Sequence, residues 1–399
     1  MEYTETAVAL CAVGAEKAVA GELRKLGLPV ENSEFGRVRF RADLAGLYRA
    51  LMALRAADRV LLETAFFPAG DFDALFEGVR AVPWERYIPP DLGLRVAKVR
   101  SNRSRLKAET SIQAVVHKAA AERLCGVRRV ERLPEGGDAA ELRVYVEKDR
   151  TSLLLDLSGE PLFKRGYRSE GGGAPLRETT AAAMVILSHW RRRFPLYDPF
   201  CGSGTILIEA AMYAWDMAPG LGRSFALDRL CIADRELERA VREELLGKVN
   251  FERTIRIAGS DEDGRAVSMA RSNAERAWEL AQGKNPVRGI RQSVRLPDDP
   301  GRRVLPDFRT LRMKDVRAPW NEPGFIITNP PYGKRLGNPE MAERTYGDMA
   351  ELGRHFPGWK LALITDHPGF ESFLGRKADS CREITNGAIP SYFFQYGEH

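Results

Sequence analysis

Four consecutive residues, Asn329-Pro330-Pro331-Tyr332, follow an apolar run at 325–328 and have the types needed to hold a planar amine. Prolines fix φ and lack a backbone donor, so this segment presents carbonyl acceptors. The side-chain carbonyl of Asn329 and the backbone carbonyl of Pro330 could each accept one hydrogen of an –NH₂ group. Tyr332 could stack on a nucleobase, a contact worth roughly 1–3 kcal/mol. We predict that these four residues are catalytic and align an exocyclic base amine with an activated methyl group. The alternative is a rigid Asn-Pro-Pro turn.

A glycine turn lies between an expected strand at 196–197 and an expected helix at 206–214. Glycines there would let the backbone approach a ligand, and the helix start would offer free N–H groups. The patterns of dinucleotide-binding and phosphate-binding loops are both missing. An acidic residue before the turn opposes phosphate but suits a cation, such as the amino group of S-adenosylmethionine (SAM). The residues predicted to bind this cofactor are Asp198, Pro199, Phe200, Cys201, Gly202, Ser203, Gly204 and Thr205.

Acidic residues near the ends of two later expected strands extend this predicted cofactor site. Asp261 and Glu262 follow a strand expected at 255–260, where an acid can accept hydrogen bonds from both ribose hydroxyls. Helix capping by Asp261 or Asp263 is the simpler alternative. Asp315 ends a strand expected at 309–314 and is a candidate acceptor for the adenine amine, although a plain loop aspartate fits equally well. Asn329 is predicted to contact the cofactor as well as the target amine.

A basic window at 95–107 carries six basic residues and no acidic one, and a second basic group follows at 164–168. Phosphate contacts with a nucleic acid explain such a run better than a solvated face, which remains the alternative. An expected insertion at 282–303 is also basic, and either explanation applies to it. The residues predicted to contact nucleic acid are Lys98, Arg100, Arg103, Arg105, Lys107, Lys164, Arg165 and Arg168.

The composition is that of a globular protein with two or three domains, because 44% of the 399 residues are hydrophobic and 29% are charged. The chain has no apolar run near the roughly 20 residues that a membrane helix needs. The five cysteines are scattered and form no C-x-x-C pair. This arrangement argues against disulfides and against a metal site, and it is typical of a protein in a reducing cytoplasm. The net charge of +6 permits a polyanionic partner. We therefore expect a cytoplasmic protein with no membrane segment and no metal.

Expected elements divide the chain at a triple glycine, residues 171–173. Before it, two small α+β units alternate strands and helices. After it, strands expected at 196–197, 255–260, 309–314, 324–328 and 361–365 alternate with helices, a pattern typical of a parallel sheet covered on both faces. A closing pair of strands is expected near 391–396. The fold class predicted from these patterns is α/β.

Several segments resemble known methyltransferases. Residues 196–211 and 326–333 resemble the SAM loop and the N-P-P-Y motif of class I methyltransferases, and Pro175-Leu176-Arg177-Glu178-Thr179 resembles the segment before the SAM loop of one subfamily. The whole chain is similar to THUMP-domain class I RNA methyltransferases. It is most similar to bacterial 23S rRNA guanine-N2 methyltransferases, whose relatives were once labelled adenine-specific DNA methylases.

This resemblance implies a Rossmann-like domain with a mostly parallel seven-stranded sheet, preceded by a ferredoxin-like and a THUMP unit. The implied domains are residues 1–62 (ferredoxin-like), 63–158 (THUMP, RNA-binding), 159–175 (linker) and 176–399 (methyltransferase). The implied cofactor is SAM and the implied partner is RNA, with rRNA favoured over tRNA. N-P-P-Y does not choose between guanine N2 and adenine N6. A DNA adenine-N6 methyltransferase and a non-catalytic RNA-binding assembly factor therefore remain alternatives.

Overall fold

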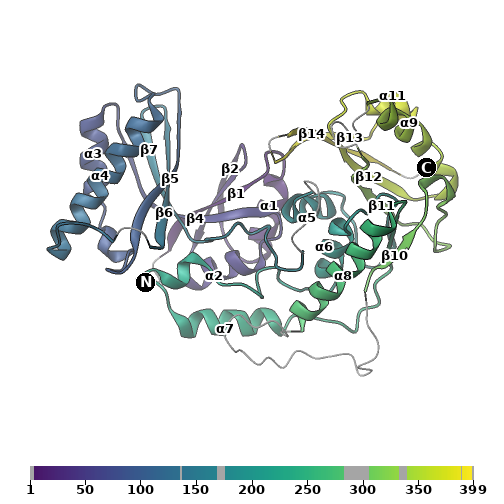
Figure 1. Ribbon diagram of the computed structural model, residues 1–399, viewed down its shortest axis with the longest axis horizontal. Helices are drawn as coiled ribbons and strands as arrows, with labels where there is room; N and C mark the ends of the chain where they lie inside the picture. The colour runs from purple at the N-terminus through teal and green to yellow at the C-terminus, as the bar shows by residue number, and fades with distance from the viewer. Residues whose placement is uncertain are drawn as a thin grey trace.

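Two seven-stranded sheets organise the protein, and they occupy opposite ends of the molecule (Figure 1). The computed structural model describes residues 4–134, 137–168, 176–282, 305–331, 339–387 and 389–397. The α/β class predicted from the sequence is confirmed, since both sheets carry helices and the second sheet is mostly parallel.

The N-terminal sheet has the strand order β2-β3-β1-β4-β7-β6-β5. Its strands are β1 (Glu5–Cys11), β2 (Val30–Glu34), β3 (Arg37–Ala42), β4 (Ala57–Pro68), β5 (Gly93–Asn102), β6 (Ala139–Glu147) and β7 (Arg150–Asp156). Its helices are α1 (Glu16–Lys25), α2 (Leu44–Ala53), α3 (Phe72–Arg80) and α4 (Glu109–Arg128), with a 3₁₀ turn η1 at Trp84–Arg86. The domain boundary predicted at 62/63 falls inside β4, which pairs with β1 on one side and β7 on the other.

Alternation along β3 shows how this sheet is built. Val38 and Phe40 are buried in the large core that also contains helix residues, whereas the three arginines between and around them point to the other face. That other face carries only a small apolar cluster of Val8, Leu61 and Leu154. The helices therefore pack on one face, and the opposite face presents arginines around a small apolar centre.

The second sheet has the order β10-β9-β8-β11-β12-β14-β13. Its strands are β8 (Leu196–Asp198), β9 (Ile257–Asp261), β10 (Asp307–Thr310), β11 (Phe325–Thr328), β12 (Lys360–Thr365), β13 (Ser380–Asn386) and β14 (Ile389–Tyr396). Its helices are α5 (Glu178–Leu187), α6 (Thr205–Ala214), α7 (Arg235–Leu246), α8 (Gly264–Ala281), α9 (Pro339–Met349), α10 (Leu352–His355) and α11 (Phe370–Leu374), with 3₁₀ turns η2 (Ala226–Arg229) and η3 (Met313–Asp315). Strands β8 to β12 are parallel, and β13 and β14 are antiparallel additions, so the predicted mostly parallel seven-stranded sheet is confirmed.

The strand order reverses between β8 and β11. The chain runs outward from β8 through β9 to β10, then returns to place β11 on the other side of β8. In open α/β sheets, ligands bind in the crevice at the carboxyl ends of strands at such a switch point. The sequence prediction of strand 309–314 is wrong in its second half, because β10 ends at Thr310 and the chain then turns into η3.

The N-terminal unit is docked closely on the second sheet. Gly14 has φ +92°, and a Cβ there would lie 2.0 Å from the Glu383 carbonyl oxygen, so only glycine allows this approach. Val13 and Thr385 exchange two hydrogen bonds beside it, at 3.0 and 3.1 Å. The segment after α6 contains η2 and α7, and α7 packs against α2. The two units are thus joined at two separate places.

Candidate active site

A cavity of about 480 Å³ opens at the carboxyl ends of β8 to β11, at the switch point of the sheet. Its lining comes from the glycine turn, the residues after β9, the residues after β10, the end of β11 and α9. The lining residues are Leu176, Asp198, Pro199, Phe200, Cys201, Gly202, Ser203, Thr205, Ile206, Asp261, Glu262, Asp263, Arg312, Met313, Lys314, Asn329, Pro331, Thr345 and Asp348.

Asp198 is the most buried acid of this cavity, with a relative exposure of 1%. Its Oδ1 accepts a hydrogen bond from the Thr328 hydroxyl at 2.6 Å and one from the Phe200 N–H at 3.0 Å. Burial raises the pKa of Asp198 to about 7, with a smaller contribution from nearby Asp261, although both hydrogen bonds act against this shift. A cationic ligand beside Asp198 would return it to the carboxylate form.

Asp261 holds the glycine turn from the end of β9, in addition to the turn's own hydrogen bond from the Gly204 N–H to the Cys201 carbonyl at 2.8 Å. Asp261 Oδ2 accepts the Gly202 N–H at 2.9 Å, and its Oδ1 accepts the Asp263 N–H at 3.0 Å. Gly202 has φ +51°, and a Cβ there would meet open space, so the turn leaves room for a ligand. Helix α8 is capped by Asp263, which accepts the Arg265 N–H at 2.8 Å. Capping therefore does not account for Asp261.

Asn329 stands directly after β11 and lines the cavity with Pro331. Its side-chain Oδ1 is buried and has no hydrogen-bond partner among the residues that the structure describes. A buried acceptor without a partner costs free energy, on the order of 1–3 kcal/mol, unless a ligand supplies the donor. The geometry thus leaves one carbonyl oxygen available at the cavity.

The cavity is acidic on balance. Five of its lining residues are acids (Asp198, Asp261, Glu262, Asp263 and Asp348) and two are bases (Arg312 and Lys314). Clefts lined by one sign of charge attract ligands of the other sign. A cationic ligand is therefore favoured over a phosphate at this position.

The structure brings most of the predicted cofactor and catalytic residues to one cavity, with four exceptions. Gly204 (φ +83°) starts α6, and Pro330 is buried, so neither lines the cavity. Tyr332 lies outside the described residues. Asp315 is exposed at the end of η3 and does not line the cavity, because β10 ends before it.

Several lining residues were not predicted from the sequence. Arg312, Met313 and Lys314 occupy the place expected for Asp315, and a correct end for β10 would have indicated them. Asn273 is fully buried on α8, and its Nδ2 donates to the Ser203 carbonyl at 3.0 Å, which supports the glycine turn from behind. Only its place on the inner face of a helix could have suggested this role.

The predicted nucleic-acid window forms the edge strand β5 and the loop after it. Lys98, Arg100, Arg103, Arg105 and Lys107 are all exposed there. Arg100 pairs with Glu109 at 2.9 Å and Arg105 with Asp149 at 3.0 Å. Lys164 is exposed and pairs with Glu160. Arg95, the first cation of the window, pairs with Glu141. The window is thus accessible, but carboxylates offset three of its six cations.

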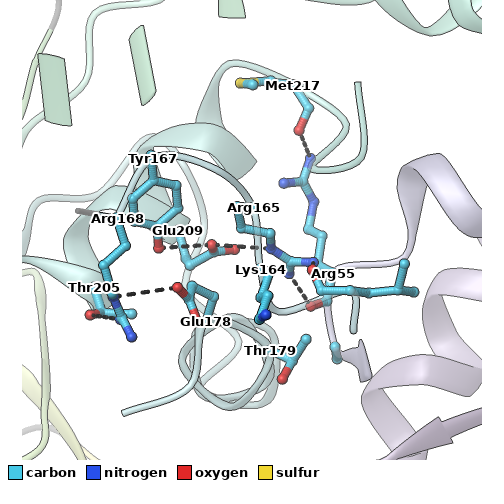
Figure 2. Close-up of polar contacts among 12 residues, drawn as sticks. Arg55, Lys164, Arg165, Tyr167, Arg168, Glu178, Thr179, Thr205, Glu209 and Met217 are labelled. Atoms are coloured by element: carbon cyan, nitrogen blue, oxygen red, sulfur yellow. Dashed lines mark hydrogen bonds and ion pairs between the residues drawn. The ribbon is translucent and has the colours of Figure 1, made fainter. Parts of the chain in front are cut away.

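The prediction that Arg165 contacts nucleic acid is wrong. Its side chain is 2% exposed and lies 3.4 Å from the fully buried Glu209. Figure 2 shows this guanidinium also donating to the Arg55 carbonyl, while Tyr167 donates to Glu209 at 3.1 Å. A charged pair inside the protein cannot reach a phosphate backbone, and the local sequence gave no sign of this burial.

Arg168 is also used inside the protein. It donates to the Leu176 carbonyl at 3.1 Å. It also donates to the Thr205 hydroxyl at 2.7 Å and lies 3.4 Å from Glu178 (Figure 2). Leu176 and Thr205 both line the acidic cavity. Arg168 therefore supports the wall of that cavity, and its three protein partners disfavour the predicted contact with nucleic acid.

None of the helices within the described ranges combines the length and the apolar character needed to cross a membrane. Within the same ranges, no group of three or more His, Cys, Asp or Glu side chains is arranged to hold a metal ion.

A parallel sheet with this strand order, an acidic cavity at its switch point and an asparagine-proline strand end define a SAM-dependent class I methyltransferase. A family model for RMKL-like methyltransferase domains matches residues 165–282 and 301–393, and a model for the RlmL ferredoxin-like domain matches residues 6–61. The chain belongs to the RMKL-like methyltransferase family.

Relatives along the whole chain agree with this family. YpsC of Bacillus subtilis (strain 168), a protein assigned as an RNA methyltransferase, is 35% identical over 98% of this chain and 95% of its own length. The ribosomal RNA large subunit methyltransferase K/L of Syntrophotalea carbinolica is 34% identical over 94% of this chain but only 51% of its own length. The chain thus spans about half the length of the K/L relatives.

A solved structure has the same fold throughout. The protein SMU.472, described as a methyltransferase and crystallised with SAH, aligns with a TM-score of 0.85 and 34% identity over 100% of this chain and 99% of its own.

We expect Arg165→Met to lower the free energy of unfolding by about 3–5 kcal/mol, because it leaves the buried Glu209 carboxylate without its partner. Adding Glu209→Leu to the same chain should recover most of that loss. Urea denaturation of both variants measures this, with Lys164→Met as the control, since Lys164 is exposed and makes one surface pair. Wild-type stability of Arg165→Met together with weakened nucleic-acid binding would contradict the structural role.

Proposed function

We propose that this protein transfers a methyl group from SAM to an exocyclic base amine of RNA, and that the target is guanine N2 of large-subunit rRNA. The observation that carries the amine assignment is the buried, unpartnered Oδ1 of Asn329 at the cavity. The rRNA assignment is supported by the names of the K/L relatives, which cover this chain with about half of their own length.

SAM would supply an already activated methyl group on its sulfonium. The residues that fit the cofactor are those of the acidic cavity. Asp198 would accept from its cationic amino group, and Asp261 with Glu262 would face its ribose. Gly202 leaves open space where a side chain would intrude. Arg312, Met313 and Lys314 follow β10, at the place where the adenine would lie in this proposal.

The target amine would be held by Asn329 Oδ1 and the Pro330 carbonyl, with Tyr332 stacking on the base. Alignment of the nitrogen lone pair with the methyl group supplies most of the catalysis in this arrangement, and a strong base is not required. A cysteine-nucleophile route to a carbon atom is disfavoured, because burial raises the pKa of the Cys201 thiol and keeps it protonated. Cys201 is the single described cysteine that lines the cavity.

RNA would reach this site along a second, basic cavity of about 630 Å³ between the N-terminal sheet and the catalytic unit. Lys98 and Arg100 line it, and Phe35 lines it with a relative exposure of 84%, which offers a stacking surface. Arg177 lines this cavity while the preceding residue, Leu176, lines the acidic one. A strand of RNA lying on Lys98, Arg100, Arg103, Arg105 and Lys107 could thus continue toward Asn329.

Asn329→Ala should abolish methyl transfer to rRNA and leave SAM affinity close to that of the wild type, since most contacts to the cofactor would come from Asp198, Asp261 and the glycine turn. Mass spectrometry of nucleosides from rRNA, tRNA and DNA, with and without the gene, tests the substrate. Loss of N6-methyladenine from DNA with unchanged rRNA would instead establish the DNA adenine alternative. Equal loss of SAM binding and of transfer would make Asn329 structural.

SAM affinity should rise with pH up to about 7 and then level off. The folded-state pKa of Asp198 is raised to about 7, so below that pH the neutral acid must lose a proton before it pairs with the cationic cofactor. The slope should approach one decade per pH unit well below pH 7. Calorimetry between pH 5.5 and 8 measures it, and Asp198→Asn should show a weaker affinity without this slope. A wild-type affinity that is flat across the range would rule out a role for Asp198 in binding the cation.

Replacing Arg100, Arg103 and Arg105 together by alanine should weaken RNA binding and lower its salt dependence by about 2–3 in the logarithmic slope, one unit for each lost phosphate contact. Filter binding at several salt concentrations measures both quantities. The control is Arg235→Ala with Arg239→Ala, which removes two charges rather than three, from exposed arginines of α7 that line none of the cavities named above. An unchanged slope would move the RNA surface away from β5.

A further inference from the structure

A groove of about 930 Å³ lies on the far side of the catalytic sheet from the acidic cavity. Phe325 and Lys360, the first residues of β11 and β12, line it, whereas Asn329 follows the last residue of β11. The groove therefore lies at the amino ends of the parallel strands. The four residues of β11 separate it from the opposite edge by about 13 Å. We call it the amino-edge groove.

Seven cations line this groove: Lys17, Arg24, Lys25, Arg191, Arg193, Lys360 and Arg382. They come from α1, from the segment between α5 and β8, and from β12 and β13. All except Arg382 are exposed. The one acid in the lining, Asp379, lies 4.0 Å from Arg376 and also accepts the Gly397 N–H. The groove is thus strongly basic.

None of these seven cations forms an ion pair with a carboxylate anywhere in the described part of the chain. On β5 and its loop, by contrast, Arg100 and Arg105 are paired with Glu109 and Asp149. Unpaired like charges gathered in a hollow repel one another, and they concentrate anions there. The amino-edge groove therefore favours a polyanionic ligand more strongly than the basic window at 95–107 does.

The chemistry of the walls favours a phosphate backbone over a membrane surface. Among the described residues, no large hydrophobic side chain that is exposed lines the groove, and Phe325, Leu361 and Tyr396 of its lining are buried. The cations sit around a recess, while a bilayer presents a flat surface. The one exposed aromatic ring of the described lining is the imidazole of His189, since Phe325 and Tyr396 are buried and Phe194 is half-buried. Most contacts of the groove would therefore be made to phosphates and would be independent of sequence.

We propose that the amino-edge groove binds the phosphate backbone of an RNA helix distant from the target nucleotide. This proposal rests on the proposed RNA substrate. The same RNA would place its target amine at Asn329 and a second helix against Arg24, Arg191 and their neighbours. The protein would then hold the RNA at two edges of one sheet.

The test compares two double variants with the same change in net charge. Arg24→Glu with Arg191→Glu alters the groove, and Arg235→Glu with Arg239→Glu alters exposed arginines of α7 outside it. The probes are a 24-base-pair RNA duplex of arbitrary sequence and transcribed large-subunit rRNA. The groove variant should bind both at least tenfold more weakly at 150 mM salt, with a logarithmic salt slope shallower by about 2. Thermal melting and SAM binding of both variants check that the fold is intact.

Equal losses for the two variants would overturn the proposal, because the effect would then follow net charge alone. Undiminished RNA binding by the groove variant would also overturn it, whether or not binding to phosphatidylglycerol vesicles is lost, as would a wild-type protein that binds neither probe. Failure of the proposed function is distinguishable from these results. If the wild type methylates no RNA yet binds the duplex through the groove, the groove stands and the activity falls. If the wild type methylates rRNA and the groove variant binds both RNA probes normally, the proposed activity stands and the groove proposal fails.

Discussion

The hydrogen bond from the Thr328 hydroxyl to Asp198 Oδ1, at 2.6 Å, is the contact on which the active site depends. It joins the last residue of β11 to the last residue of β8, across the point where the strand order reverses. The glycine turn begins after Asp198, and Asn329 begins after Thr328, so this one bond sets the distance between the cofactor loop and the amine-holding strand end. Both partners are buried, and a buried hydrogen bond to an acid is stronger than one in water.

Contiguous motifs were predictable from the sequence, because their chemistry is carried by neighbouring residues. The turn at 198–205 follows β8 and the Asn-Pro-Pro segment follows β11. Because β8 and β11 are parallel neighbours, the sheet brings their carboxyl ends together at one edge. Asp315 does not line the cavity because β10 ends at Thr310, and the end of a strand is set by its tertiary pairing, here with β9, which the sequence does not show. Asn273 was missed because its role depends on which helix face is inside.

The role of charged residues was the hardest feature to predict from the sequence, because the sequence does not show which charges are paired or buried. Arg165 lies in a basic run, but its partner Glu209 is 44 residues away on α6, and packing buries both. The amino-edge groove shows the converse. Its cations come from three separate regions of the chain, residues 17–25, 191–193 and 360–382, and only Arg191-Arg192-Arg193 forms a basic run in the sequence. A run of like charges is therefore weaker evidence for a polyanion site than a set of unpaired charges in one hollow.

The buried polar contacts around Arg165 also connect the two halves of the protein. Arg165 binds Glu209 of α6 and the Arg55 carbonyl, and Arg55 in turn donates to the Met217 carbonyl at 2.7 Å beyond α6 (Figure 2). Arg55 belongs to the turn between α2 and β4, within the N-terminal unit. Breaking this network would leave charges buried without partners, at a cost far above that of a surface contact. The N-terminal sheet is therefore held at a fixed place relative to Asn329. An RNA bound to that sheet would present only those nucleotides that lie at this fixed separation, so target choice would follow from geometry as much as from recognition of the base.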